Sequence, residues 1–316
     1  MIAVLTGGTG GAKFLQGVVR AVPPRQVTAI VNTGDDVVWW GLNISPDIDS
    51  VMYGLAGLLS RERGWGLEGD TFACLEHMRE LGEPSWFQLG DRDLATHVRR
   101  TGMLRSGKTL TAVTAELAAS FGVSSRLLPM TDDRVETRVL TARGELSFQE
   151  YFVREKWKVP VRKVRFAGAE TARPTFEVLR AIASAEVIVI APSNPITSIG
   201  PILAVPGIRE ALRSSPAQKV AVSPIISGKA FSGPADQLMV AHGFPATVAG
   251  VAAIYREFLS TLVIDHADAA SVSEIEALGL RAVCASTLMN SEDAKRDLAA
   301  VCLAAGRSHT RAATNL

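Results

Sequence analysis

Six short apolar runs, continuous rather than alternating with polar residues, mark the strands of this chain. They cover residues 2–5, 27–31, 187–190, 220–222, 262–264 and 281–284. Strands with one face in water alternate in polarity, whereas strands covered by helices on both faces are apolar throughout. The pattern therefore predicts an α/β fold with a Rossmann-like parallel sheet and helices on both of its faces.

The middle of the chain has a different pattern. Residues 70–82 and 110–122 have helical periodicity, and each segment ends in a glycine that can adopt the left-handed C-cap conformation. Residues 135–153 contain two alternating runs around Ala142, Arg143 and Gly144, which predicts a β-hairpin. We expect residues 1–49 and 167–316 to form a nucleotide-binding core, and residues 50–166 to form a helical and hairpin insertion that covers the sheet.

Composition excludes several classes of protein. The net charge of +1 gives no overall field that would attract nucleic acid or an acidic membrane surface. The three cysteines are far apart, which argues against a disulfide framework or a structural zinc site. No apolar run reaches the roughly 18 residues of a membrane span, and no export signal precedes the first strand. A cytoplasmic protein without nucleic-acid or membrane partners is expected.

A glycine-rich turn follows the first strand. Gly7, Gly8, Thr9 and Gly10 lead into an amphipathic helix that carries Lys13. The turn matches neither the dinucleotide fingerprint, because Lys13 replaces a small residue, nor the Walker motif, because no Gly-Lys-Ser/Thr follows. Exposed N–H groups and a helix N-terminus still favour a nucleotide phosphate. The alternative is a tight strand-to-helix turn that needs glycine for its backbone geometry alone.

A second segment, residues 102–109, satisfies the Walker pattern in full. A polar, helical segment precedes it, whereas a phosphate-binding loop must follow a buried strand. We predict a helix-to-helix connection there, with Thr109 as the N-cap of the second helix.

Four aspartates follow the second strand. Asp35, Asp36, Asp47 and Asp49 should lie near the glycine turn, because loops at the carboxyl ends of neighbouring parallel strands face one crevice. Such carboxylates can hold Mg²⁺ together with substrate phosphates. Alternatively, they stabilise turns or cap a helix that begins near Ser50. The adjacent Trp39 and Trp40 pack in the core or stack on a flat ring.

Residues 91–97, which include two more aspartates, are predicted to begin a helix. Asp91 and Asp93 there are favourable against the helix dipole. Arg92 forms a local ion pair or points at an anionic or planar substrate. His97, one turn further, is expected to pack or bond locally rather than to catalyse.

Two polar loops follow strands in the second half of the chain. They present hydroxyl, amide and backbone donors without much net charge, as a diphosphate or a base edge requires. The candidate nucleotide ligands there are Ser193, Asn194 and Ser198 in the first loop, and Ser223, Gly228 and Lys229 in the second. Ordinary connection chemistry explains either loop alone, but both together with the glycine turn favour a nucleotide pocket.

These segments, taken in order, resemble the 2-phospho-L-lactate transferases of coenzyme F-420 biosynthesis, the CofD or FbiA family. The resemblance rests on GGTGGAKF, NTGDD, ISPDIDSVMY, RGWG, LGDRDLATH, LLPMTDD, APSNPITSIGPI, SPIISGK and SGPADQLM, and it covers nearly the whole chain.

The resemblance implies a Mg²⁺-dependent transferase that moves a phospho-acid group from a guanosine-diphosphate-linked donor to the ribityl hydroxyl of the deazaflavin Fo, with release of GMP. It implies catalytic roles for Asp35 and Asp49, metal binding by Asp35, Asp36 and Asp49, and deazaflavin contacts from Asp49, Arg92 and Trp40. The guanine nucleotide would bind the glycine turn and the two polar loops. The three-carbon acid is lactyl, enolpyruvyl or glyceryl, and a homodimer is expected.

Two other readings remain open from the sequence. A YvcK-like regulatory protein would bind a nucleotide sugar without catalysis. Such regulators carry a serine- and glycine-rich arginine loop after the second strand, whereas this chain has GLNISPDIDSVMY there. An NAD-dependent dehydrogenase is disfavoured by Lys13 in the glycine turn.

Overall fold

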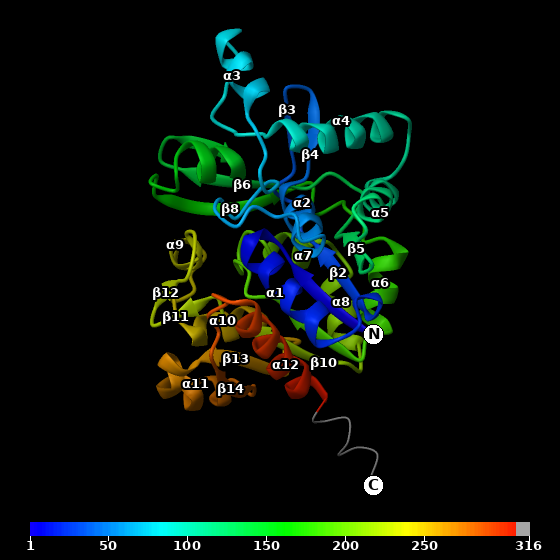
Figure 1. Ribbon diagram of the computed structural model, residues 1–316. Helices are drawn as coiled ribbons and strands as arrows, with labels where there is room; N and C mark the ends of the chain where they lie inside the picture. Colours follow the sequence, from blue (N-terminus) through cyan, green and yellow to red (C-terminus); the bar gives the residue numbers. More distant parts are fainter. Residues whose placement is uncertain (308–316) are drawn as a thin grey trace.

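A seven-stranded, all-parallel sheet forms the centre of the computed structural model, which describes residues 1–307 (Figure 1). The strand order is β14-β13-β10-β9-β1-β2-β5. The strands are Ile2–Thr6 (β1), Val27–Val31 (β2), Arg126–Pro129 (β5), Val187–Ile190 (β9), Gln218–Val222 (β10), Thr261–Asp265 (β13) and Arg281–Ala285 (β14). The six strands expected from the sequence are confirmed, and so is the fold class.

Helices cover both faces of this sheet. One face packs on α1 (Gly8–Ala21), α2 (Pro46–Leu55), α5 (Leu110–Ser120) and α12 (Glu292–Arg307). The other packs on α6 (Phe176–Ala183), α7 (Gly200–Ala204), α8 (Ile208–Ser214), α9 (Ala235–Ala241), α10 (Val248–Tyr255) and α11 (Val272–Ala277). Neighbouring residues of a strand point to opposite faces of the sheet and pack in different hydrophobic cores. Val4 packs in the core under the first set of helices, and Leu5 packs in the core under the second set. This explains why the strands are apolar throughout.

The chain runs outward from the centre of the sheet in two directions. From β1 it proceeds through β2 to β5, and then returns to β9 on the other side of β1. The loops after β1 and β9 therefore diverge at their carboxyl ends and leave a crevice, the usual ligand site of such sheets.

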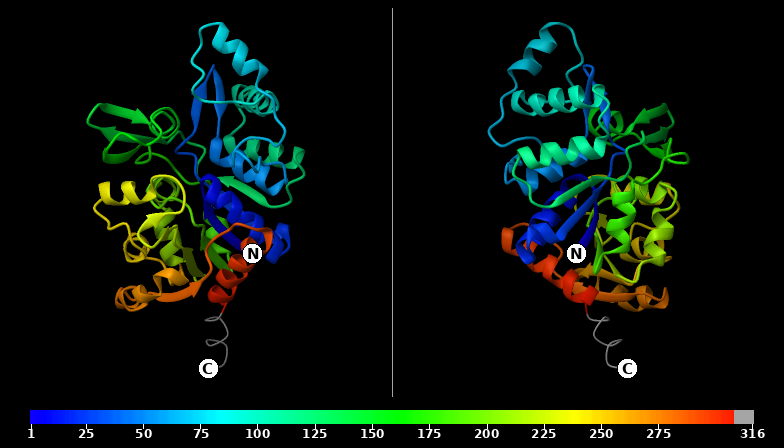
Figure 2. Two further views of the ribbon diagram at one scale, coloured as in Figure 1. Left: turned by 60° about the vertical axis from the view of Figure 1, so that its left-hand side comes forward. Right: turned by 90° about the vertical axis from the view of Figure 1, so that its right-hand side faces the viewer.

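A roof of smaller elements stands over this edge of the sheet. It contains β3 (Val37–Trp39), β4 (Leu42–Ile44), α3 (Ala73–Glu80), α4 (Asp91–Arg105), the π-helical turn Glu150–Arg154 and a sheet of β7 (Gly144–Ser147), β6 (Glu136–Thr141) and β8 (Val161–Ala167). Figures 1 and 2 show the roof on the side opposite the first residue and the end of α12. Three short elements complete the chain: the 3-10 helices Pro24–Gln26 and His266–Ser271, and the hairpin of β11 (Ile225–Ile226) and β12 (Lys229–Ala230).

The predicted helices of the middle segment and its hairpin, β6 and β7, are confirmed. Gly82 and Gly122 follow the two helices at φ of 87° and 71°, so both positions need glycine. Thr109 caps α5 by accepting a 3.2 Å hydrogen bond from the Ala112 N–H. Residues 102–109 thus connect two helices, as expected.

Two expectations about the first half need correction. The helix after the aspartates begins at Pro46 rather than near Ser50, because proline fits the first helical position. Strand β5 lies inside residues 50–166 and pairs with β2, so that segment is not purely an insertion. The sequence does not reveal β5 because its apolar run is only Leu127 and Leu128 between an arginine and a proline. The sequence GRSHTRAATNL, residues 306–316, also predicts a frayed tail, and this prediction falls mostly outside the described residues.

Candidate active site

A cavity of about 770 Å³ opens at the crevice between the loops after β1 and β9. Eleven of the predicted site residues line it: Gly7, Gly8, Thr9, Gly10, Lys13, Asp35, Asp49, Ser193, Asn194, Ser198 and Ser223. They come from parts of the chain more than 200 residues apart. The parallel topology brings them together, because every contributing loop follows the carboxyl end of a strand.

The glycine turn is held too tightly for side chains. Gly8 has a φ of 68°, and a Cβ on Gly7 would lie 2.5 Å from Asp47 Oδ2. Ser193 fastens the turn to the opposite loop by donating its hydroxyl to the Gly7 carbonyl over 2.7 Å. α1 has no acidic residue in its own first turn, so the positive end of that helix faces the cavity. The Asp47 carboxylate offsets part of that charge by accepting a hydrogen bond from the Gly8 N–H, and the turn can still receive an anion.

Asp35 and Asp47 form the acidic part of the cavity beside the glycine turn. Burial, and next the charge of Asp47, raise the pKa of Asp35 well above its usual range. Burial raises the pKa of Asp47 to about 6, although hydrogen bonds from Asn32 and the Gly8 N–H oppose this. Asp35 Oδ1 is buried without a hydrogen-bond partner. Two buried, mutually repelling carboxylates with a free oxygen are a suitable place for a cation.

Asp49 lies deeper and is engaged by a buried arginine that sequence reasoning missed. Arg100 is fully buried on α4 and pairs with both carboxylate oxygens of Asp49, one of them at 3.0 Å. Burial alone would lower the pKa of Arg100, but the Asp49 carboxylate outweighs it and raises that pKa. Arg100 also donates to His97 Nδ1 at 3.2 Å. Asp49 therefore keeps only its outer lone pairs for a ligand.

His97 and Asp93 continue this network along α4. His97 Nε2 lies 3.3 Å from Asp93 Oδ1, and Tyr53 donates its hydroxyl to the same oxygen over 2.7 Å. Burial would raise the pKa of Asp93, but His97 and the Tyr53 hydroxyl lower it overall. The prediction that His97 bonds locally is confirmed. Asp93 is a buried network member rather than a helix-dipole residue alone.

Asp36, Trp40, Arg92, Gly228 and Lys229 do not line the cavity. Asp36 is half-buried and accepts a 2.7 Å hydrogen bond from the Ser45 hydroxyl. Trp40 donates its indole N–H to the Pro84 carbonyl at 3.2 Å, and exposed Arg92 donates to the Glu68 carbonyl at 3.1 Å. Gly228 and Lys229 lie at the end of the β11–β12 hairpin. Each is held by local structure away from the crevice.

Asp91 has a role that sequence spacing could not show. Its carboxylate accepts hydrogen bonds from the backbone N–H groups of Ala73 and Cys74, at the start of α3. Asp70, at the other end of the connection, accepts from the N–H groups of Arg92 and Asp93, at the start of α4. The two helices cap each other through space.

Aromatic side chains also line the cavity. They are Tyr53, Trp65, Trp86, Phe87, Phe148, Phe152, Trp157 and Phe231. Phe152 stacks between Phe148 and Trp157, with ring centroids 5.4 and 4.9 Å apart. The sequence predicts ring stacking only for Trp39 and Trp40. Most of the observed aromatic wall comes from the roof, while Tyr53 lies on α2 and Phe231 follows β12.

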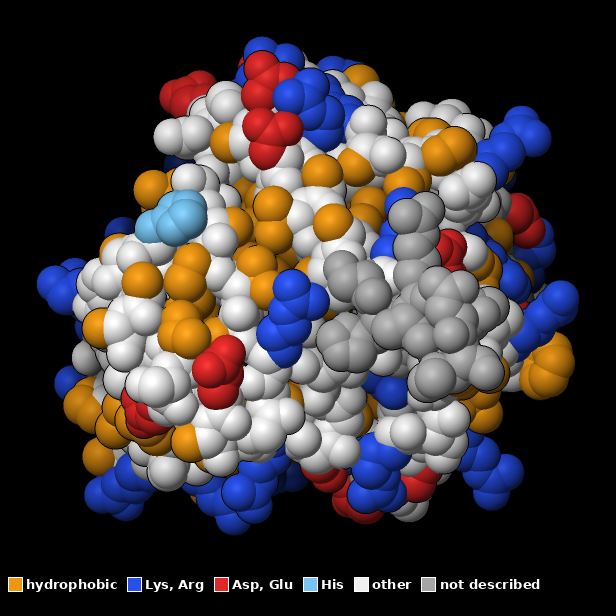
Figure 3. Space-filling view, turned by 90° about the horizontal axis from the view of Figure 1, so that it is seen from below, with side chains coloured by type: hydrophobic (Ala, Val, Ile, Leu, Met, Phe, Trp, Pro, Cys, Tyr) orange, Lys and Arg blue, Asp and Glu red, His pale blue; other side chains and the backbone are white. Residues whose placement is uncertain are grey.

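Within residues 1–307, no three His, Cys, Asp or Glu side chains are arranged to hold a metal by themselves. No helix of this part of the chain has the length and apolar character needed to cross a membrane. On the underside of the molecule, Lys and Arg side chains lie around the rim together with Asp and Glu (Figure 3). Among the described side chains visible on that face, the two signs of charge are mixed and form no stripe of the kind that nucleic-acid binding requires.

Three kinds of comparison agree on relatives. A family model described as 2-phospho-L-lactate transferase CofD matches residues 2–296. A phosphoenolpyruvate transferase from Streptomyces griseus is 46% identical over 304 residues, which cover 94% of this chain and 96% of the relative. A 2-phospho-L-lactate transferase from Methanosarcina mazei is 42% identical over 298 residues, covering 94% and 98%.

The crystal structure of a UPF0052 family protein from Bacillus halodurans superimposes with a TM-score of 0.65 over 96% of this chain and 98% of that one, at 19% identity. This likeness shows the fold. The sequence matches show more: the chain is a transferase and belongs to the 2-phospho-L-lactate transferase CofD family.

Proposed function

We propose that this transferase moves a phospho-acid group from a guanosine-diphosphate-linked donor to the ribityl hydroxyl of the deazaflavin Fo and releases GMP, with Mg²⁺ required. The transferred group is 2-phospholactyl or its enolpyruvyl or glyceryl counterpart. The observation that carries the proposal is that the Asp35–Asp47 pair and the glycine turn share one cavity with the aromatic wall. An anion, a cation and a flat ring each find a suitable surface there.

The donor diphosphate fits the inner end of the cavity. The N–H groups of the glycine turn and the positive start of α1 attract phosphate oxygens, and Lys13 adds a charge on the same helix. Asn194, Ser198 and Ser223 offer polar groups on the opposite loops. Ser193 is already bonded to Gly7, so its part is chiefly to hold the turn in shape.

The residues present fit a divalent cation. Asp35 and Asp47 provide two neighbouring carboxylates, one with an unpartnered oxygen, and Mg²⁺ usually takes one or two carboxylates plus phosphate oxygens and water. Mg²⁺ would neutralise charge on the diphosphate during transfer. This assignment replaces Asp36 and Asp49 with Asp47, since Asp36 does not line the cavity and is bonded by Ser45, and Arg100 engages Asp49.

The transfer itself needs mainly positioning and charge neutralisation. The acceptor hydroxyl oxygen attacks the phosphorus that carries the acid, and the bond from that phosphorus to the bridging oxygen breaks. The bond electrons leave with GMP. The hydroxyl proton passes to a cavity carboxylate, for which we propose Asp49, because it lines the cavity and its outer lone pairs are not used by Arg100.

The acceptor ring fits the aromatic wall. Flat rings stack favourably on aromatic side chains, and the wall lies in the same cavity as Asp49. Trp40 and Arg92 contact other groups in this structure, so we assign the acceptor ring to the aromatic wall rather than to these two residues.

Product analysis tests this function directly. Purified protein is incubated with Fo, Mg²⁺ and each guanosine-diphosphate-linked phospho-acid, and the products are weighed by mass spectrometry. We expect one donor to give a phospho-acid ester of Fo and one equivalent of GMP, and omission of Mg²⁺ to abolish both. Donor binding without any product would instead support a regulatory protein. Light scattering of the same sample tests the expected homodimer.

A further inference from the structure

Two lysines are the only Lys or Arg side chains that line the cavity in the described part of the chain. Lys13 projects from α1 beside the glycine turn, and Lys156 comes from the loop after the π-helical turn of the roof. Lys156 lies at the exposed mouth and makes no ion pair or hydrogen bond through its ammonium group within residues 1–307. It is a free cation in a cavity with four aspartates.

The backbone around Lys156 is held in an unusual shape. Lys156 and Trp157 have φ values of 50° and 46°, a left-handed region that residues other than glycine rarely adopt. Trp157 is fixed there by stacking on Phe152 and by an N–H donated to the Tyr151 carbonyl over 3.0 Å. Such strain persists only where the surroundings impose it, and it concentrates at functional sites.

This loop is also tied to the proposed metal pair. Gln149 donates its side-chain amide to the Asp35 carbonyl oxygen over 3.1 Å. From there the stacked rings of Phe148, Phe152 and Trp157 lead to Lys156. The position of Lys156 is thereby set relative to Asp35 rather than left to a free loop.

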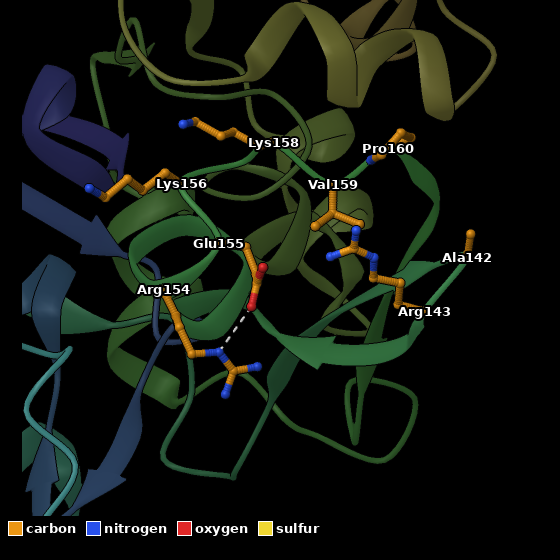
Figure 4. A pocket seen from close by; sticks show the side chains of 8 residues that line it. All are labelled: Ala142, Arg143, Arg154, Glu155, Lys156, Lys158, Val159 and Pro160. Carbon is orange, nitrogen blue, oxygen red and sulfur yellow. Dashed lines mark hydrogen bonds and ion pairs between the residues drawn. The ribbon is translucent and has the colours of Figure 1, made fainter.

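Neighbouring cations are separated from the cavity. Arg143, Arg154 and Lys158 surround a smaller adjoining hollow of about 370 Å³, which Lys156 also borders (Figure 4). Arg154 is paired with Glu150 and Glu155. In Figure 4 the side chains of Lys156 and Lys158 extend to the same side, away from Arg143. Of this basic group, Lys156 alone also lines the main cavity.

When the charges of the cavity are paired with those of the proposed donor, one group of the donor has no counter-ion. Asp35 and Asp47 together balance a divalent cation, Arg100 is balanced by Asp49, and Lys13 with the start of α1 serves the diphosphate. The transferred three-carbon acid also carries a carboxylate, and a carboxylate beside aspartates needs a cation.

We propose that Lys156 binds the carboxylate of the transferred acid and thereby selects carboxylate-bearing donors. The inference rests on the proposed function and adds the residue that recognises the carboxylate of the acid. The ion pair gains strength as the bound donor displaces water from the mouth, since an exposed pair alone contributes little.

The test compares binding of two donors to three proteins in the presence of Mg²⁺. One donor is guanosine diphosphate esterified with lactate, and the other is identical except for a carboxamide in place of the carboxylate. The proteins are wild type, Lys156→Asn and Lys158→Asn, and titration calorimetry measures each dissociation constant. Asparagine tolerates left-handed φ, so the Lys156→Asn loop can keep its shape. Lys158→Asn removes the same charge two residues away, from the hollow alone.

We expect Lys156→Asn to weaken the carboxylate donor about tenfold and to leave the carboxamide donor within twofold of wild type. Lys158→Asn should change neither by more than twofold, and Lys156→Arg should restore most of the affinity. An equal loss for both donors, or an equal effect of Lys158→Asn, overturns the assignment. Binding needs no turnover, so a wild type that binds the carboxylate donor selectively but forms no product refutes the proposed reaction and not the role of Lys156.

Discussion

Asp47 is a buried carboxylate that folding holds at an unfavourable place. Because its pKa is about 6 in the folded protein, compared with an ordinary value of 3.8, its ionised form opposes folding above pH 6 by about 3 kcal/mol. Asp47→Asn removes that charge while its side chain can still bond Asn32. We expect the metal-free variant to gain about 1–3 kcal/mol in free energy of unfolding at pH 7.5 and to lose at least a hundredfold in transfer rate.

Urea unfolding at pH 7.5 and pH 4 measures this gain, which should vanish at pH 4 because Asp47 is then protonated in wild type as well. Asp91→Asn is the matched control, since that exposed carboxylate caps α3 and its loss should lower stability instead. A less stable Asp47→Asn protein at pH 7.5 would contradict the origin assigned to the pKa.

Arg100 tests the opposite situation, a buried charge that is fully paired. Arg100→Met leaves Asp49 ionised and buried without its partner, so we expect unfolding to require about 3–5 kcal/mol less. Adding Asp49→Asn should recover a large part of that loss, because the orphaned charge is then removed as well. Urea titrations of both single variants and the double variant form the cycle. Additive losses would mean that the two side chains act independently.

The role of a residue could be predicted from the sequence only where the residues it acts with lie near it in the chain. The glycine turn and its lysine could be identified because the motif is contiguous and its chemistry is carried by backbone N–H groups. The Asp49–Arg100 pair could not, because the two residues are 51 positions apart and meet only when α4 crosses α2. The mutual capping of α3 and α4 by Asp70 and Asp91 was hidden for the same reason.

At the scale of elements, the packing of α1 on α12 depends on one glycine. A Cβ on Gly17 would overlap the Lys295 carbonyl, so Gly17→Ala must push the two helices apart. We expect a loss of about 2–4 kcal/mol in unfolding free energy, measured by thermal or urea denaturation. Gly102→Ala, at an exposed position of α4 with nothing within 4 Å, should instead gain roughly 0.5–1 kcal/mol. Similar effects at both positions would mean that helix propensity, not helix contact, decides.

Element types were predictable where many residues repeat one signal. The central strands are buried on two faces and the long helices are periodic, so both could be read from apolar patterns. Strand β5 has only two leucines between an arginine and a proline, and β3 and β4 have three residues each, so none of the three shows a distinct apolar pattern. Their places are decided by pairing partners and by the loops that fold over the crevice, neither of which local sequence encodes.

For the whole molecule, the acidic crevice predicts an unusual dependence of stability on pH. The pKa values of Asp35, Asp36 and Asp47 are all raised, chiefly by burial. The folded protein therefore binds more protons than the unfolded chain above pH 4, so stability is full below that pH and is lost as pH rises through the folded pKa values. For Asp47 this window runs from about pH 4 to about 6. Asp93 acts oppositely, because its lowered pKa gives stability that is lost only in stronger acid.

Ligands should reverse this trend, because a cation between Asp35 and Asp47 favours the same ionised forms that weaken the free protein. We expect the melting temperature of the ligand-free protein to fall between pH 4.5 and 7. Saturating GDP and Mg²⁺ should raise the melting temperature more at pH 7.5 than at pH 5. The stabilisation by ligand is about 2.7 kcal/mol when free ligand is a hundredfold above its dissociation constant. Differential scanning calorimetry with GDP, with Mg²⁺ and with both separates the contributions of the two ligands.

Since Asp47→Asn lacks one of the two charges, the Mg²⁺-dependent part of the stabilisation should be largely lost in that variant. A magnesium effect that is equal at both pH values, or unchanged in Asp47→Asn, would place the cation elsewhere in the molecule.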